Sequence, residues 1–565
     1  MATKKGVWGI QDVKDKMTAS EWDYQGAKSL WSWGYNQYGE LAQNNRTQYS
    51  SPVQIPGSWS MIHNKWAGGT NDIGYMGTKA DGTLWTWGRN TDGQLGQNQG
   101  PAQIEAASSP VQVGSGTDWG GGGATSLYGK MAAIKTDGTM YMWGSNTYSG
   151  GLGLNGPTAT VGGNDGRISS PTQIGGTWKT GRDTITAITD GFLAINASGE
   201  LMSWGRDWYG STGQNVPDGT RRSSPVKIGS ASNWATVSDG GNIRVGAINT
   251  DGELYTWGRG EFGELGHNNR TQKSAPIQVG SDTNWHRLSM TEYTAMATKT
   301  DGTLWMWGRN NFGQLGQNSR QEDWGKSSPI QVPGTNWDID NFQLAMNHVK
   351  AMKTDGTLWT WGNNGYGQLG LNNRTKYSSP VQIPGTTWAK LPVACAENAP
   401  AGSAAIKTDG TLWTWGNNPA GSLGHNNRTL YSSPTQVPGT NWSNVACGTK
   451  AFMATKTDGT LWVMGDNERG ALGQNEGPGS SSSGLRSSPT QIPGTNWDGT
   501  QMKLPANSEG MMAMKTDGTI WVWGHIGSWA GQNNTTLRSS PVQIGSDTSW
   551  LKIGGGIAIN ALKRV

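Results

Sequence analysis

The sequence predicts an all-β protein assembled from many copies of one four-stranded unit, and two observations carry that prediction. The first is composition: the 565 residues include 87 Gly and 32 Trp, and only 15% are charged, against about 25% in an ordinary soluble domain. The second is self-similarity: residues 355–364 read DGTLWTWGNN and recur almost unchanged at 409–418. Together they indicate one short unit copied along the chain.

The repeat accounts for nearly the whole sequence. Related copies begin at Asp81, Asp137, Asp251, Asp301, Asp458 and Asp517, with weaker ones at Lys28 and Ser198. The large residue before the recurring Gly then marks ten units, at Trp33, Trp87, Trp143, Trp204, Trp257, Trp307, Trp361, Trp415, Met464 and Trp523.

Each unit is expected to form four short strands. In the unit of Trp415 we expect them near residues 391–395, 403–407, 412–415 and 434–437. Asp409-Gly410 separates the second strand from the third, and Asp-Gly between apolar runs is a strong hairpin signal because Gly tolerates positive φ. Pro434 is expected at the first position of the fourth strand, where a missing N–H is tolerated.

The third strand indicates how the units assemble. Leu412 and Trp413, then Thr414 and Trp415, place apolar or large side chains on both of its faces, and such a strand is buried on both faces. Stacking each small sheet between two neighbours achieves this burial. Radial stacking of four-stranded sheets is a β-propeller.

The motif KTDGTLWTWGNNxxGxLG, as it stands around Trp359 and Trp413, resembles the regulator of chromosome condensation repeat. The resemblance covers residues 28–562 and implies a propeller. Members of that family usually have seven blades, so ten copies depart from the pattern.

The chain ends predict how the propeller closes. The first unit starts at a third strand, 29–33, and residues 551–554 and 557–561 supply the missing first and second strands. Pairing of these termini removes exposed sheet edges. We therefore expect about ten four-stranded blades closed by the N- and C-terminal strands, with an open spiral or a seven-bladed arrangement as the alternatives.

The N-terminal segment differs in kind from the repeats. Trp8, Ile10, Val13, Met17 and Trp22 stand among charged residues without an Asp-Gly turn, and apolar spacing near three and four suggests a short amphipathic helix. Its amino-acid sequence resembles the N-terminal sequence of structural proteins from tailed phages of marine bacteria. We expect residues 1–27 to form an anchor segment and residues 28–565 to form the propeller.

The loops are expected to sort onto two faces. Turns between second and third strands, and between successive units, are short and uniform, whereas the third-to-fourth loops vary and lengthen at 97–107, 154–168, 317–326 and 474–486. Length variation confined to one side often marks the binding side. Trp208, Trp324 and Trp529 in these loops are the candidate partner contacts; the alternative is that each folds back on its own loop.

No active site is apparent from the residues. The six His show no metal-ligand spacing, the repeated Asp belongs to turns, and no catalytic residue, metal site or cofactor is predicted. Cys395 and Cys447 are expected to be buried free thiols. Asn-Arg-Thr at Asn45, Asn269, Asn373 and Asn427 matches a glycosylation sequon, but its recurrence at one loop position favours a structural role.

These observations favour a non-catalytic virion protein, a propeller platform on a phage head or tail. Its expected partners are other virion proteins or a host surface receptor, with a glycan as a further candidate. The net charge of +4 does not suggest nucleic acid, and no apolar run is long enough for membrane insertion. The alternatives are a cellular protein-binding regulator of the GTPase-exchange or chromatin type, as the repeat resemblance implies, and a carbohydrate-binding or inhibitory propeller.

Overall fold

The computed structural model describes residues 28–62, 74–125, 129–146, 150–155, 166–181, 184–239, 243–291, 293–319, 325–345, 347–392, 394–395, 402–448, 450–475, 484–504, 510–525, 538–553 and 558–564. The expected anchor segment, 1–27, lies outside these ranges, so its helix and its role stay predictions.

Strands in the described residues occupy four positions in the repeating unit. First strands are β6 (Trp119–Thr125), β10 (Ile185–Ile188), β14 (Trp234–Asp239), β18 (Trp285–Met290), β22 (Trp337–Leu344), β26 (Trp388–Lys390), β31 (Trp442–Cys447), β35 (Trp497–Lys503) and β39 (Trp550–Ile553). Second strands are β3 (Gly74–Lys79), β7 (Lys130–Lys135), β11 (Gly191–Ile195), β15 (Arg244–Asn249), β19 (Thr294–Lys299), β23 (His348–Lys353), β28 (Gly402–Lys407), β32 (Ala451–Lys456), β36 (Gly510–Lys515) and β40 (Ala558–Arg564).

Third strands are β1 (Lys28–Gly34), β4 (Leu84–Arg89), β8 (Met140–Ser145), β12 (Leu201–Arg206), β16 (Leu254–Gly258), β20 (Leu304–Gly308), β24 (Leu358–Gly362), β29 (Leu412–Gly416), β33 (Leu461–Gly465) and β37 (Ile520–Gly524). Fourth strands are β5 (Ala106–Gln112), β9 (Arg167–Ile174), β13 (Arg221–Lys227), β17 (Lys273–Gln278), β21 (Lys326–Gln331), β25 (Tyr377–Ile383), β30 (Tyr431–Gln436), β34 (Arg486–Ile492) and β38 (Arg538–Gln543). The remaining elements are β2 (Tyr49–Ile62), β27 (Ala394–Cys395) and the 3-10 turn η2 (Glu468–Gly470).

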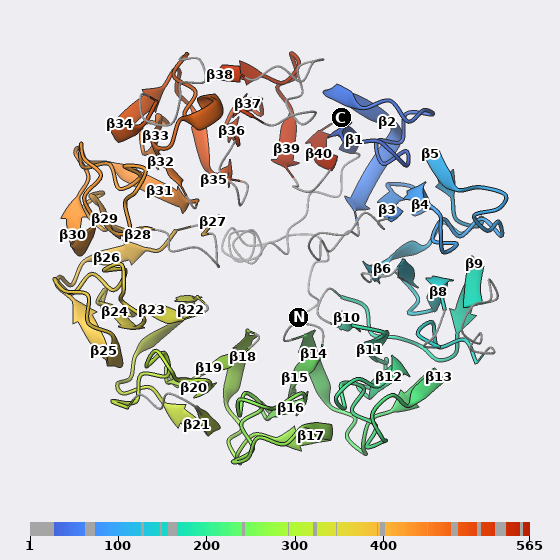
Figure 1. The fold of residues 1–565 in the computed structure, drawn as a ribbon. Coiled ribbons are helices and arrows are strands. Elements are labelled where there is room, and N and C mark those ends of the chain that lie inside the picture. Colours follow the sequence, from blue (N-terminus) through green and yellow to red (C-terminus); the bar gives the residue numbers. More distant parts are fainter. Residues whose placement is uncertain are drawn as a thin grey trace, which may run out of the picture.

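The strands form an all-β propeller with many four-stranded antiparallel blades. Most sheets join four strands in chain order, as in β14-β15-β16-β17 and β18-β19-β20-β21. Figure 1 shows the sheets following one another around a common centre, with first strands such as β14 and β18 innermost and fourth strands such as β17 and β21 at the periphery. The prediction of this fold class is confirmed.

The Asp-Gly turn connects second and third strands as expected. In the hairpin β23–β24, Gly356 has a φ of +79°. The Thr357 N–H and hydroxyl donate to Oδ1 of Asp355 at 2.9 and 2.7 Å. The left-handed position requires Gly, and the Asp side chain closes the turn, which explains why the same residues recur in almost every unit.

The third strand is buried on both faces, as its sequence predicts. In β24, Leu358, Thr360 and Trp361 are fully buried. Trp361 packs in a cluster that also contains Met306 and Leu315 of the preceding unit. Because each cluster is shared between adjacent sheets, the core lies between sheets, and each sheet is stabilised by its neighbours.

The chain ends lie side by side. β40 pairs antiparallel with β1 along its length, from Lys28 opposite Arg564 to Gly34 opposite Ala558, and β39 pairs with β40. Of the predicted strand 557–561, residues 558–561 are described, and they pair with residues 31–34. The same sheet continues through the long β2 into β3, β4 and β5, so the first two units are joined rather than forming separate four-stranded sheets.

Two expectations for the unit of Trp415 were wrong in detail. The first strand of this unit is β26, which ends before the expected range 391–395 and pairs with β28. Within that range, β27 pairs in parallel with β31 of the next unit. Pro434 is the fourth residue of β30 and not the first. It is accommodated at an irregularity, since the pairing with β29 shifts register between Thr414 and Gly416, and Pro is tolerated at bulges and edges.

The parallel pairing of β27 with β31 places Cys395 opposite Cys447. Cys447 is buried, as expected. The expected burial of Cys395 stays a prediction.

Candidate functional site

Strand direction divides the loops between two faces. One face contains the ends of first and third strands, the starts of second and fourth strands, and the loops that join them, and we name it the variable face. Its described loops between third and fourth strands include 35–48, 90–105, 207–220, 259–272, 363–376 and 417–430. The opposite turn face carries the Asp-Gly turns and the turns between units. The candidate site lies on the variable face.

A buried side chain holds most of the described loops of the variable face in shape. Asn364 accepts a hydrogen bond from the Leu369 N–H at 3.0 Å, and its amide donates to the carbonyls of Asn373 and Thr375 at 3.0 and 2.9 Å. The same acceptor role recurs at Asn36, Asn90, Asn310, Asn418 and Asn467. In the unit of Trp208, Asp207 takes it. The loops are therefore held by internal hydrogen bonds, although they lack regular strands.

Each loop is also fixed to the next sheet. The Asn372 N–H donates to the Ser432 carbonyl at 2.6 Å, and the Trp415 indole donates to the Gln368 carbonyl at 2.8 Å. A Cβ on Gly367 would meet Ser432 Cα at 2.8 Å, and this Gly has a φ of +71°. The close approach requires Gly, so the loop spans two sheets and presents a rigid surface.

Aromatic side chains at the loop tips pair with cations of the following unit. The Arg89 guanidinium lies 4.6 Å from the Tyr38 ring, Arg259 lies 5.0 Å from Tyr209, and Lys376 lies 4.8 Å from Phe312. Tyr209 is 36% exposed, and Tyr366, at the same loop position two units beyond Phe262, is 42% exposed. The exposed tyrosines leave aromatic ring surface available to a partner.

Trp208 lies on this face, but it is tied to its own sheet. The Arg206 guanidinium stacks on its ring at 3.7 Å, and its indole donates to Oδ2 of Asp190 at 2.8 Å. The side chain is half-buried, so one edge remains accessible. Trp324 and Trp529 lie outside the described residues, as do Trp8, Ile10, Val13, Met17 and Trp22. Whether any of them contacts a partner stays a prediction.

The sequence reasoning overlooked Tyr209 and Tyr366. A usable signal was present, because the residue before the Gly of the loop's Gly-x-Leu sequence is aromatic in several units (Tyr38, Phe262, Phe312). Because only Trp residues were considered as candidate contacts, this recurring aromatic position was missed. The paired arginines, which directly follow third strands, were overlooked for the same reason.

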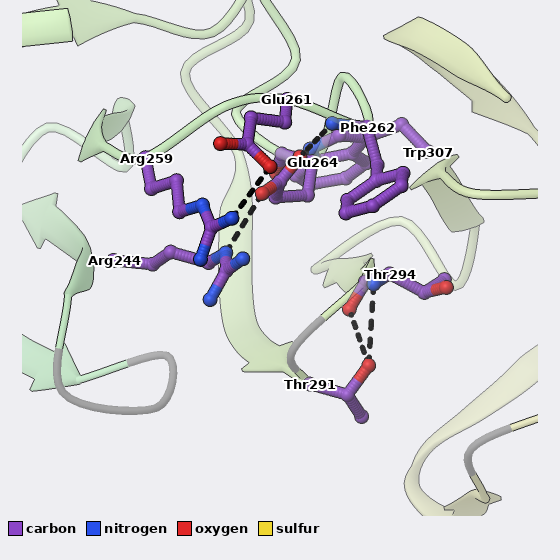
Figure 2. A network of polar contacts seen from close by, with 8 residues as sticks. All are labelled: Arg244, Arg259, Glu261, Phe262, Glu264, Thr291, Thr294 and Trp307. Atoms are coloured by element: carbon purple, nitrogen blue, oxygen red, sulfur yellow. Dashed lines mark hydrogen bonds and ion pairs between the residues drawn. The ribbon is translucent and has the colours of Figure 1, made fainter. Parts of the chain in front are cut away.

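A buried ion pair stiffens the variable face in one unit. Arg244, at the start of β15, is 1% exposed and donates through Nε to Oε1 of Glu264, which is 0% exposed, at 2.7 Å. The other carboxylate oxygen of Glu264 accepts from the Phe262 N–H at 2.8 Å. Figure 2 shows this pair beside the Arg259–Glu261 contact of 2.6 Å. Charge burial of this kind requires a partner, so the pair fixes the loop tip that carries Phe262.

The histidines of the variable loops serve structure. Nε2 of His267 and of His425 lies within hydrogen-bond distance of the hydroxyls of Thr256 and Thr414, at 2.9 and 2.8 Å. Burial lowers the pKa of both imidazoles below the usual value. Neutral imidazoles in these surroundings are consistent with a packing role.

Metal-binding and membrane features are not found in the described parts of the chain. No group of three or more His, Cys, Asp or Glu that could hold a metal occurs among them. No helix long and apolar enough to cross a membrane occurs among the same residues.

The sequon positions have internal partners. The amide of Asn373 donates to the Leu371 carbonyl and to the Tyr377 hydroxyl at 2.9 and 2.8 Å, and its oxygen accepts from the Thr375 N–H at 2.9 Å. Asn427 repeats all three contacts. The structural role expected for Asn-Arg-Thr is supported by these bonds.

A groove of about 450 Å³ opens at the periphery, between β17 and β21. It is lined by Ile277, Gln278, Asp282, Trp305 and Pro329 among others. It shows no set of converging charged groups of the kind that orients a small ligand, so the variable face remains the candidate site.

Comparisons with known proteins agree with the architecture. A family model described as RCC1-like domain matches residues 241–561, and one described as Regulator of chromosome condensation (RCC1) repeat matches residues 81–118. The human E3 ubiquitin-protein ligase HERC2 is 25% identical over 407 residues, which cover 69% of this chain and 8% of the ligase. The Ultraviolet-B receptor UVR8 of Arabidopsis thaliana is 27% identical over 357 residues, 60% of this chain and 74% of the receptor.

The chain thus spans only a small part of the ligase. Among solved structures, Saccharomyces cerevisiae Prp20p aligns with a TM-score of 0.40 at 16% identity, covering 66% of this chain and 93% of Prp20p. Because the RCC1-like model matches more than half of the residues, the chain belongs to the RCC1-like domain family.

Proposed function

We propose that the protein is a non-catalytic, protein-binding propeller that engages its partner through the variable face. The observation that carries the proposal is the pairing of loop-tip aromatics with arginines of the next unit, as in Tyr209 and Arg259. Tyr, Trp and Arg are the residue types that dominate binding energy at protein interfaces. Loops already fixed by hydrogen bonds lose little conformational entropy when they bind.

The related proteins support a regulatory role. HERC2 and UVR8 are by name a ubiquitin ligase and a receptor, and the reported relatives come from human, mouse, plant and fish. These relatives support the alternative hypothesis, a cellular protein-binding regulator, better than they support a virion protein. We include in this proposal a partner of the GTPase-exchange or chromatin type. The proposal also holds that the protein has no enzymatic activity.

Site-specific photo-crosslinking tests the proposal. A photoreactive aromatic residue is placed at Tyr209 or Tyr366 on the variable face, and at Ile277 on the periphery as a control with similar exposure (40%). In the cells that express the protein, we expect the same partner protein to be crosslinked from both tyrosine positions and not from Ile277. Equal capture at all three positions, or capture at Ile277 alone, would contradict a binding site on the variable face.

A second candidate places the same platform on a phage particle. The amino-acid sequence of residues 1–27 favours it. In this hypothesis residues 28–565 form the propeller, and the anchor is formed by Trp8, Ile10, Val13, Met17 and Trp22. None of the reported relatives is a virion protein. Deleting residues 1–26 is expected to leave a folded propeller that is no longer incorporated into particles. Normal incorporation of the truncated protein would exclude the anchor.

We further propose that the units close into one ring of ten blades. The pairing of β1 with β40 supports it, because it leaves neither terminal strand as a free edge. Electron cryomicroscopy of the purified chain is expected to show a ring with tenfold pseudo-symmetry. A seven-bladed ring or an open spiral would overturn the count. The glycan-binding alternative predicts binding on a glycan array that is lost when Trp208, Trp324 and Trp529 are changed to Ala.

A further inference from the structure

The turn face of the propeller exposes a recurring series of carboxylates. On the turn face, the tip of almost every Asp-Gly turn carries an exposed carboxylate: Asp81, Asp137, Asp251, Asp301, Asp355, Asp409, Asp458 and Asp517. Hydrogen bonds from Thr357 hold the pKa of Asp355 below its usual value, and Asp409 and Asp458 have the same arrangement with Thr411 and Thr460. Asp355, Asp409 and Asp458 are therefore ionised at neutral pH.

The lysines of the turn face are less available than its carboxylates. Nζ of Lys353 lies 4.9 and 4.8 Å from the ring centroids of Trp337 and Trp359. Lys407 and Lys515 are held between two indoles in the same way. Each Lys is half-buried, whereas the Asp two residues later is exposed. The charge that the turn face offers to a neighbour is consequently acidic.

Arginine gathers on the variable face. Among the residues that the structure describes, every arginine except Arg287 and Arg564 lies at the variable end of a strand or in a loop of that face. Arg374 and Arg428 are exposed, and their Nε atoms donate to the carbonyls of Gly365 and Pro419 at 2.8 and 2.6 Å. These bonds orient the guanidinium groups without supplying a counter-charge.

The acidic and basic series match in spacing. Strand β16 has Asp251 just before its start and Arg259 just after its end, and β20 has Asp301 and Arg309 in the same places. The two charges of each unit therefore lie at opposite ends of one strand. In the next two units, Arg374 and Arg428 occupy the same loop position as each other, after Asp355 and Asp409 respectively.

We propose that the variable face of one copy docks onto the turn face of a second copy, head to tail. Stacked in this way, carboxylates of one copy meet arginines of the other in several units at once. The contact is heterologous, so each docked copy leaves one acidic and one basic face for further copies. The inference rests on the proposed function only in using the same face, and it identifies one partner as another copy of this chain.

Sedimentation velocity of the full chain tests the stack. At low ionic strength we expect the mass to rise from monomer to dimer and beyond with protein concentration. At about 0.5 M salt, where the screening length is about 4 Å, we expect monomer. A chain that remains monomeric at low ionic strength throughout the concentration range would overturn the stack, and partner capture at Tyr209 and Tyr366 would then still stand as an independent result.

Paired variants establish which faces meet. A turn variant carries Asp355→Asn, Asp409→Asn and Asp458→Asn, which keep the Oδ1 acceptor of each turn. A loop variant carries Arg374→Gln and Arg428→Gln. We expect either variant alone to self-associate about tenfold more weakly than the unaltered chain.

Mixing the two variants is the decisive measurement. The intact variable face of the turn variant then meets the intact turn face of the loop variant, so a one-to-one complex with near-normal affinity is expected, without longer stacks. Undiminished self-association of the turn variant alone would indicate a symmetric contact between variable faces and overturn the proposal. Thermal melting of both variants confirms that they are folded before either result is interpreted.

Discussion

The indole N–H of Trp307 donates to the backbone carbonyl of Glu264 in the preceding unit at 2.7 Å, and Trp307 is fully buried. The bond joins the third strand of one sheet to the variable loop of its neighbour. It recurs as Trp87 with Glu40, Trp143 with Gln94, Trp257 with Ser211, Trp361 with Gln314 and Trp415 with Gln368. The repeat thus ties its core to the loops that form the candidate site.

This bond is open to a matched test. Trp204 is equally buried, but its indole nitrogen has no hydrogen-bond partner among the residues that the structure describes. Trp307→Phe and Trp204→Phe remove the same atoms, yet only the first loses a bond. We expect Trp307→Phe to lower the free energy of unfolding by about 1 kcal/mol more than Trp204→Phe, as measured by urea denaturation. Equal losses would show that the bond contributes nothing beyond packing.

The glycines of the variable loops are expected to be intolerant of substitution. Gly266 has a φ of +82°, and a Cβ there would lie 3.0 Å from Nε1 of Trp307. Gly229 has a φ of +62° with no heavy atom within 4 Å of its Cβ position. Both Ala variants incur left-handed strain of about 1 kcal/mol, but Gly266→Ala should lose a further 1–3 kcal/mol or so from overpacking. Thermal melting compares the two, and similar losses would contradict the steric argument.

The buried ion pair is expected to be strongly non-additive. Glu264→Gln leaves the Arg244 charge buried without its counter-ion and should cost about 3–5 kcal/mol. Gly74 and Gln94 occupy the two equivalent positions in another unit and lie against each other. The double variant Arg244→Gly with Glu264→Gln restores that pair, so it should be more stable than Glu264→Gln alone. Additive losses in a double-mutant cycle would show that the two residues act independently.

Acid is expected to destabilise the protein through His348. Burial, with a contribution from Lys350, lowers the pKa of this imidazole from 6.5 to about 3. As the pH falls below about 6.5 the unfolded chain takes up the proton first, so stability present at neutral pH is lost progressively toward pH 3. His348→Gln should therefore lose less stability than the unaltered chain between about pH 7 and pH 4.

The control is His286→Gln, which replaces a side chain that is 40% exposed on β18. The His348 ring protons should show no titration above about pH 4 by NMR. A titration midpoint near 6.5 would contradict the burial argument.

The sequence by itself determined the repeating sheet, its turns and the neighbouring places of the two chain ends. Asp355 and Gly356 define a turn through local conformational preference. The large or apolar residues from Leu358 to Trp361 predict that both faces of the third strand are buried. Such signals are contained within a few consecutive residues, so they can be read without coordinates.

Only the tertiary structure decided the partners that come from different units. Nothing local to Trp307 shows that its indole donates to the Glu264 carbonyl, or that Tyr209 lies against Arg259. The pairing of β27 at Cys395 depends likewise on β31 of the next unit, more than forty residues away. These contacts arise from the packing of one sheet against another, and packing between segments distant in sequence has no signature in either segment alone.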